Sequence, residues 1–117
     1  VSLELKPLGV YVTLVEPGPF RTKWAGGGLV HAPVEIADYE NTAHFTRRNL
    51  AQVDQNQAGD PVRAAELIWE VSNMENPPLR LLLGAQAYKV VERKLERMQA
   101  EYAQWKEKGV ATDFPTR

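Results

Sequence analysis

The sequence has no cysteine, only two histidines and a formal net charge of −1, and each of these shortages excludes a class of function. Without cysteine, the chain can form neither disulfides nor thiolate sites. The near balance of 14 basic against 15 acidic residues gives no electrostatic basis for binding nucleic acid or a membrane surface. No apolar run approaches the length of a membrane-spanning helix, and no leader pattern is visible, so we expect a cytoplasmic protein.

The remaining composition is that of an ordinary globular domain, with 44% hydrophobic and 25% charged residues. A length of 117 residues allows one domain with a modest core. The segment from Val1 to Lys6 reads as the end of a helix with Leu3 in the core, Pro7 prevents its continuation, and Gly9 can take a left-handed turn. A chain that begins inside a helix leads us to expect a single partial domain over residues 1–117.

The stretch from Gly9 to Thr22 organises the chain. Val10 to Val15 is an apolar, β-rich run without polar alternation, which predicts a strand covered on both faces, as in a parallel sheet. Pro17-Gly18-Pro19 follows it and ends the ladder, because proline donates no N–H and glycine permits a turn. The chain therefore leaves the carboxyl end of a strand in a stiff loop, which is where ligands bind in open α/β sheets.

Two further helices and a second strand are predicted after this loop. Asp38 could cap a helix from Tyr39 to about Val53. Asp60 and Pro61 form a strong helix start, and that helix should end between Asn73 and Asn76. Its predicted buried face comprises Val62, Ala65, Ile68 and Trp69. The helix would serve as the crossover to a parallel strand over residues 79–83.

The last predicted helix runs over residues 85–108 and ends at Gly109. Its apolar residues recur at alternating spacings of three and four, which is the narrow stripe typical of coiled coils, over fewer than three heptads. The members of this stripe are Tyr88, Val91, Leu95, Met98, Tyr102 and Trp105.

The motif Pro17-Gly18-x-Phe20-x-Thr22 after an apolar strand resembles the Pro-Gly segment of the short-chain dehydrogenase/reductases. The order of helix tail, strand, Pro-Gly loop, long loop, Asp-Pro helix and short strand resembles the C-terminal part of that family's domain. The resemblance implies an α/β fold, the C-terminal fragment of a Rossmann-like doubly wound parallel sheet with two parallel strands plus helices.

The resemblance also implies site residues and a cofactor. Pro17, Gly18, Phe20 and Thr22 would lie at the nicotinamide end of NAD or NADP, with the Phe20 backbone at the carboxamide. Residues 23–58 would cover the substrate, and the candidates for its pocket are Trp24, His31 and Phe45. The parent protein would transfer a hydride between nicotinamide and a small carbonyl or alcohol substrate.

Several signatures of the family are missing, so we assign no catalytic residue to this chain. It has no glycine-rich cofactor loop after a first strand, no catalytic Ser and no Tyr-x-x-x-Lys in the family's context. Tyr102 and Lys106 have that spacing, but Tyr102 belongs to the terminal apolar stripe, which favours packing. We therefore expect the chain alone to be inactive and to bind the cofactor weakly or not at all.

Each candidate also has a purely structural interpretation. The Pro-Gly loop could be a strand-ending turn, and Trp24 and Phe45 could be ordinary packing residues. His31 and His44 lack the spacing of a metal pair, so no metal site is predicted. The glycines at 26–28 lie outside any strand-to-helix junction and read as a mobile loop rather than a phosphate loop.

Two partners remain open alternatives at this stage. The chain could be a homo-oligomer, or it could bind a missing N-terminal half through the free edge of residues 10–15. In a different class of function, it would be a small interaction module that self-associates through the helix at 85–108.

Overall fold

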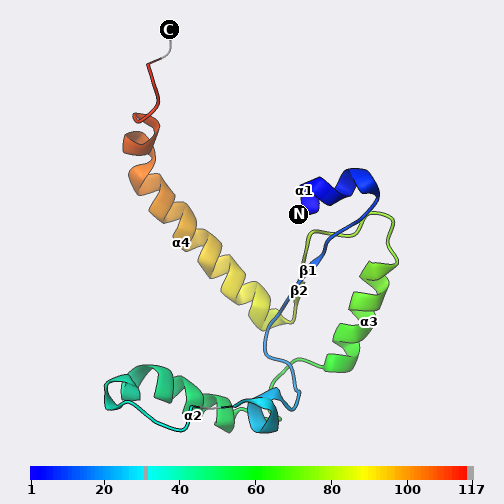
Figure 1. Ribbon diagram of the computed structural model, residues 1–117, viewed down its shortest axis with the longest axis vertical. Helices are drawn as coiled ribbons and strands as arrows, with labels where there is room; N and C mark the ends of the chain where they lie inside the picture. Colours follow the sequence, from blue (N-terminus) through cyan, green and yellow to red (C-terminus); the bar gives the residue numbers. More distant parts are fainter. Residues whose placement is uncertain (31, 116–117) are drawn as a thin grey trace.

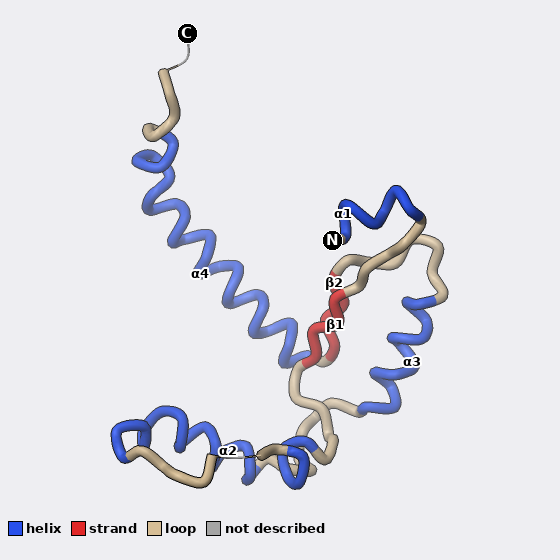
Figure 2. Tube along the Cα trace, in the orientation of Figure 1, coloured by secondary structure: helices blue, strands red, loops and turns tan. Residues whose placement is uncertain are grey.

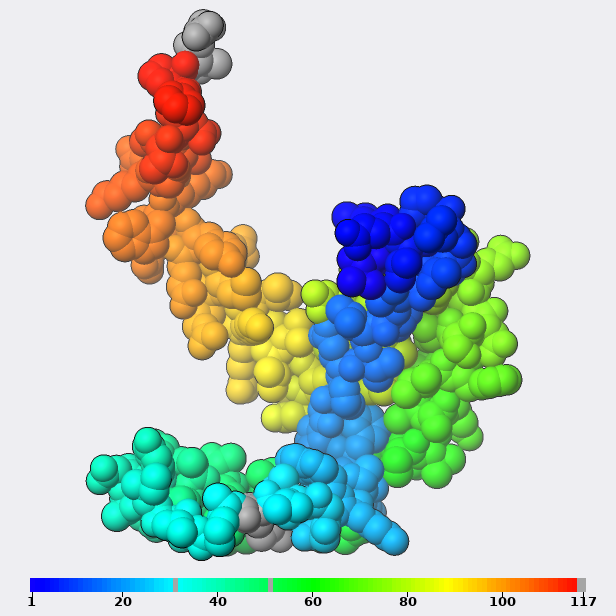
Figure 3. Space-filling view, viewed as in Figure 1, coloured from blue at the N-terminus to red at the C-terminus, as the bar shows by residue number. Residues whose placement is uncertain are grey.

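The structure is a computed structural model that describes residues 1–30 and 32–115. His31 therefore lies outside the described residues. The structure measures 62 × 46 × 25 Å in total, and α4 and the region of α2 project in different directions from the sheet (Figures 1 and 3). In chain order the elements are α1 Ser2–Leu5, η1 Lys6–Leu8, β1 Leu14–Pro17, η2 Trp24–Gly28, η3 Ala37–Tyr39, η4 Glu40–His44, α2 Phe45–Gln52, α3 Pro61–Ser72, β2 Arg80–Leu83 and α4 Ala85–Val110.

The centre of the fold is a two-stranded parallel sheet, in which β1 pairs with β2 and α3 lies in the connection between them (Figure 2). Leu14 lies opposite Arg80 and Pro17 opposite Leu83. Parallel strands require such a crossover, so the predicted α/β fold with two parallel strands and helices is confirmed.

The strand limits differ from the prediction of residues 10–15. The ladder opens where the N–H of Leu14 donates to the Leu79 carbonyl at 2.8 Å, and it closes where the N–H of Gly18 donates to the Leu83 carbonyl at 2.9 Å. Residues 10–13 have the sequence of a strand, but the pairing with β2 begins only at Leu14, so they have no strand partner within the described sheet. Pro17 lies inside the strand. Proline has no N–H to donate, but the bond that closes the ladder comes from the next residue, Gly18, so Pro17 does not interrupt it.

Burial is much lower than the sequence patterns predict. The buried apolar residues are few: Ala25, Val71, Leu83 and Ala87. Leu14 and Val15 on β1 are 43% and 40% exposed, so the prediction of a strand covered on both faces is wrong for this chain. Leu3, predicted to be in the core, is 87% exposed. Two short strands and one crossover helix offer too little surface to cover these residues.

The start of α3 follows the predicted capping chemistry. The Asp60 carboxylate accepts a hydrogen bond from the Val62 N–H at 2.9 Å, and Pro61 occupies the first helical position. The predicted buried face is wrong, however, because Val62, Ala65, Ile68 and Trp69 are exposed and Val71 is the buried residue. Val62 and Trp69 are 64% and 72% exposed, so the described residues leave their side of α3 open to solvent.

We expect the substitution Asp60→Ala to lower the free energy of unfolding by about 1 kcal/mol, because the Val62 N–H loses its side-chain acceptor. Asp60→Asn is the matched control, because its amide oxygen can accept the same bond. Chemical denaturation of the variants measures the difference. Equal stability of the alanine and asparagine variants would contradict this role of Asp60.

Two other predicted helix limits require correction. Asp38 does not cap a helix; it lies inside η3, and the helical path continues through η4 before α2 begins at Phe45. Gly109 does not end α4, which continues to Val110 and closes with Ala111 donating to the Glu107 carbonyl. The predicted left-handed turn at Gly9 is confirmed by its φ of 74°.

Candidate functional site

The loop that leaves β1 is fixed to the segment before α3. The Gly59 N–H donates to the Pro19 carbonyl at 3.1 Å, and the Arg21 N–H donates to the Gly59 carbonyl at 2.9 Å. The Arg21 guanidinium adds two bonds to the Gln57 carbonyl, from Nε at 3.2 Å and Nη2 at 3.1 Å. Paired backbone bonds of this kind hold the two segments in parallel register and position Phe20 against Gly59.

A cavity of about 460 Å³ lies beside this loop, at the carboxyl ends of the two strands. Its wall combines the Pro-Gly loop, the end of β2, the turn η2, the end of α2 and one face of α3. The residues that line it are Val15, Pro17, Gly18, Pro19, Phe20, Thr22, Trp24, Ala25, Leu50, Val53, Gln57, Pro61, Ala64, Ala65, Ile68 and Leu83. The lining is mostly apolar with few polar groups, which is the usual character of a small-molecule site.

The cavity brings together most of the residues predicted from the sequence. Pro17, Gly18, Phe20 and Thr22 all line it, and so does Trp24. Phe45 is 55% exposed at the start of α2 and is not part of this wall, so its role in substrate binding stays a prediction. The prediction for His31 cannot be placed, because that residue lies outside the described part of the chain.

Thr22 holds the next turn of the chain in position. Its Oγ1 accepts a hydrogen bond from the Trp24 N–H at 3.3 Å, and its carbonyl accepts one from Gln55 Nε2 at 3.3 Å. The following glycines form a single wide turn, in which the Gly27 and Gly28 N–H groups both donate to the Lys23 carbonyl. The side chain of Ala25 is thereby buried under the cavity.

Gln57 is the polar residue that the sequence reasoning missed. Its side chain is only 8% exposed, it lines the cavity, and its Oε1 is buried without a hydrogen-bond partner among the described residues. An unpaired buried carbonyl typically costs about 1–3 kcal/mol. Its position, two residues before Gly59, is the only sequence signal that could have drawn attention to it.

Glu16 does not line the cavity. Its carboxylate pairs with the Arg80 guanidinium across the two strands. Tyr102 and Lys106 lie on α4, in a surface groove separate from the cavity.

Within residues 1–30 and 32–115, no group of three or more His, Asp and Glu side chains could hold a metal. The helices described there are all too short or too polar to cross a membrane.

Known proteins match the chain in both sequence and fold. Oxidoreductase BOA17 of Botryotinia fuckeliana is 28% identical over 112 residues, which cover 96% of this chain and 40% of that protein. An uncharacterised oxidoreductase of Schizosaccharomyces pombe is 30% identical over 98 residues, which cover 80% of this chain and 32% of that protein. The crystal structure of a short-chain dehydrogenase from Streptomyces avermitilis superimposes with a TM-score of 0.80 at 36% identity over 97% of this chain. No protein-family model matches the chain.

The chain spans 40% or less of the length of these proteins. Within that span, the matches confirm the predicted resemblance to the short-chain dehydrogenases and the Rossmann-like character of the fold. They are consistent with the C-terminal part of such a protein.

Proposed function

We propose that this chain forms the nicotinamide end and the substrate cover of an NAD(P)-dependent oxidoreductase. The proposal starts from its correspondence, in sequence and fold, to part of a short-chain dehydrogenase. The whole protein would interconvert a carbonyl and an alcohol on a small molecule. The observation that carries the proposal is that Pro17, Gly18, Phe20, Thr22 and Trp24 all line one cavity at the carboxyl end of β1.

The cavity suits a flat, partly polar ring. Pro17, Phe20, Leu83 and Ile68 supply apolar walls, against which an aromatic ring can pack. The buried Oε1 of Gln57 has no hydrogen-bond partner among the described residues, and an amide oxygen accepts hydrogen bonds. These residues therefore fit the nicotinamide part of the cofactor, and the bound cofactor would supply the hydride.

The role of this chain would be to position the reactants and exclude water. The Pro-Gly loop is fixed to residues 57–59 by four hydrogen bonds, so its exposed backbone is preorganised rather than mobile. Trp24 is 55% exposed at the rim of the cavity, where closure of residues 23–58 over a substrate would bury it. Such burial would remove water from the reacting atoms.

The acid–base chemistry would come from outside this chain. Reduction of a carbonyl needs a proton donor at its oxygen, and among the described residues no titratable side chain lines the cavity. Most of the affinity for a dinucleotide in this kind of fold comes from a glycine-rich turn that joins a first strand to a helix N-terminus, and this sequence contains no such turn.

We therefore expect residues 1–117 alone to show no turnover of NADH or NADPH with a panel of aldehydes and ketones, and weak or no binding of either cofactor by calorimetry. The full-length protein, assayed in parallel by nicotinamide absorbance, is the positive control. Turnover by the isolated chain that disappears in Tyr102→Phe would show that Tyr102 and Lys106 act as a catalytic pair. Micromolar binding of a cofactor to the isolated chain would contradict the assignment of the phosphate sites elsewhere.

A further inference from the structure

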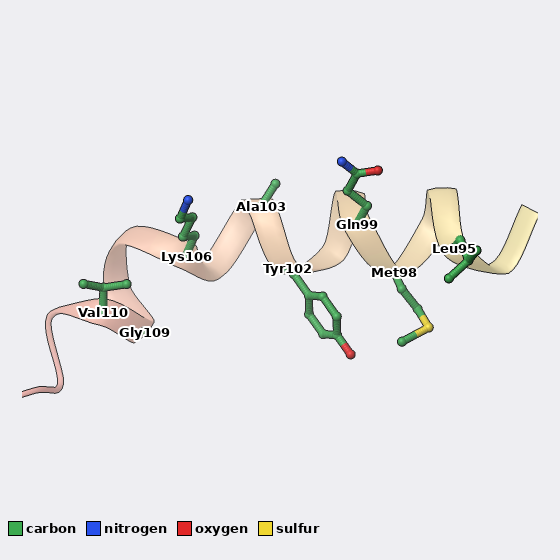
Figure 4. A pocket seen from close by; sticks show the side chains of 8 residues that line it. All are labelled: Leu95, Met98, Gln99, Tyr102, Ala103, Lys106, Gly109 and Val110. Atoms are coloured by element: carbon green, nitrogen blue, oxygen red, sulfur yellow. The ribbon is translucent and has the colours of Figure 1, made fainter. Parts of the chain in front are cut away.

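The helix α4 carries an apolar stripe that the described structure leaves uncovered. Ala87 in its first turn is buried beside β2, whereas Leu95, Tyr102 and Trp105 are 59%, 66% and 64% exposed. Beyond the first turns, the helix projects away from the sheet (Figures 1 and 3). Figure 4 shows Met98 and Tyr102 pointing to the same side of this helix. A surface groove follows the stripe along Leu95, Met98, Gln99, Tyr102, Ala103, Lys106, Gly109 and Val110.

The stripe has the spacing of a coiled-coil seam. Tyr88, Leu95 and Tyr102 occupy a positions, and Val91, Met98 and Trp105 occupy d positions. The stripe is centred between Leu95 and Met98 and extends over about 26 Å of helix. A second α4 running in the opposite direction about that centre would place every a residue opposite a d residue. The resulting layers are Tyr88 on Trp105, Val91 on Tyr102 and Leu95 on Met98.

We propose that two copies of this chain pair through α4 as an antiparallel coiled coil. The charges beside the seam fit this arrangement. Lys94 and Glu101 occupy successive g positions, and the antiparallel register brings Lys94 of one copy beside Glu101 of the other, twice by symmetry. The flanking e positions bring Glu92 beside Gln99, so no like charges meet.

A parallel pair would use the charges differently, and this difference makes the orientation testable. In that arrangement Lys94 would lie beside the uncharged Gln99, and Glu101 would lie beside Lys106. Lys94 therefore contributes to pairing only in the antiparallel form. The weak pair of Arg97 Nε with Glu101 Oε1 at 3.8 Å within one helix does not prevent either contact.

Sedimentation velocity of the chain over a concentration series measures the dissociation constant of the pair. We expect a reversible dimer, roughly tenfold weaker in Lys94→Glu and in Glu101→Lys, and restored to within about threefold of the original in the double variant. Arg93→Glu is the matched control, since it makes the same charge change at an outward f position and should leave the constant unchanged. Leu95→Glu should abolish association, and circular dichroism of each variant verifies that α4 remains helical.

Three results would overturn the proposal. One is a monomer at high micromolar concentration. Another is an association that survives Leu95→Glu, since that would place the contact at another surface such as the edge of β1. A third is a dimer that responds to Glu101→Lys but not to Lys94→Glu, because only a parallel pair behaves so. None of these measurements depends on enzymatic activity, so they are independent of the proposed function.

Discussion

Gly59→Val is expected to disrupt the loop beside the cavity and to lower the free energy of unfolding by about 3 kcal/mol or more. A Cβ at position 59 would lie 2.6 Å from Phe20 Cγ and 2.7 Å from the Pro19 carbonyl oxygen. The Gly59 N–H donates to that same oxygen at 3.1 Å, so the two segments cannot separate without losing the bonds that fix the loop. Thermal denaturation followed by circular dichroism measures the loss.

Gly109→Ala is the matched control for this prediction. An added Cβ at Gly109 meets nothing within 4 Å, and the residue lies in the last turn of α4. Alanine should therefore raise the stability of the helix by about 0.5–1 kcal/mol. A Gly59→Val variant that unfolds at the same temperature as the original chain would show that residues 19 and 59 are not packed together as described.

Ala65→Phe is expected to reduce kcat/KM of the full-length protein at least tenfold while leaving its stability close to that of the original. Ala65 lies on α3, lines the cavity and is exposed toward it, so an added phenyl ring can occupy the cavity without displacing the core. Because the cavity of about 460 Å³ is the proposed site of the nicotinamide and the substrate, the ring would compete with them for space.

The same substitution at Ala100 is the control. Ala100 is exposed on α4 at a position that faces away from the apolar stripe, so Ala100→Phe should leave kcat/KM within about twofold of the original. Normal activity of Ala65→Phe, with an unchanged melting temperature, would show that substrate and cofactor do not use this cavity.

The sequence predicted the local features of the fold better than its burial. Asp60 and Pro61 specify a helix start through bonds made within a few residues, and Gly9 specifies a left-handed turn in the same way. The apolar face that the sequence predicted for α3 is not buried, and Trp69 on it is 72% exposed. An amphipathic pattern shows which face can be buried and not whether a partner is present to cover it.

The prediction of one continuous helix between Asp38 and Val53 is wrong for a different reason. A favourable cap at Asp38 suggested one regular helix, yet the path begins with the short turns η3 and η4, which no propensity scale distinguishes from α-helix. The predicted end of the last helix at Gly109 is wrong because glycine costs a helix only about 1 kcal/mol. The helix continues to Val110, and the Ala111 N–H donates to the Glu107 carbonyl beyond it.

The structure brings most of the residues proposed from the sequence into one cavity wall, both in the stiff Pro-Gly loop and at Trp24 in the turn η2. Pro17, Gly18 and Phe20 form a contiguous motif at a strand end, and the structure places all three in the cavity wall. Gln57 was not predictable, because a glutamine in a polar loop looks like any surface residue. Its burial arises from long-range contacts, in which Arg21 holds the backbone of residue 57 against the loop after β1.

The most direct test of the proposed function is to follow the hydride itself. The full-length protein would be incubated with NADH or NADPH that carries deuterium at both positions of the hydride-donating carbon, together with the carbonyl compound that supports the fastest turnover. If this chain forms the nicotinamide end of a short-chain dehydrogenase, mass spectrometry and NMR of the alcohol should find the deuterium on the carbon that bears the new hydroxyl. An alcohol without the label, or the absence of turnover with both cofactors across the panel, would contradict the account.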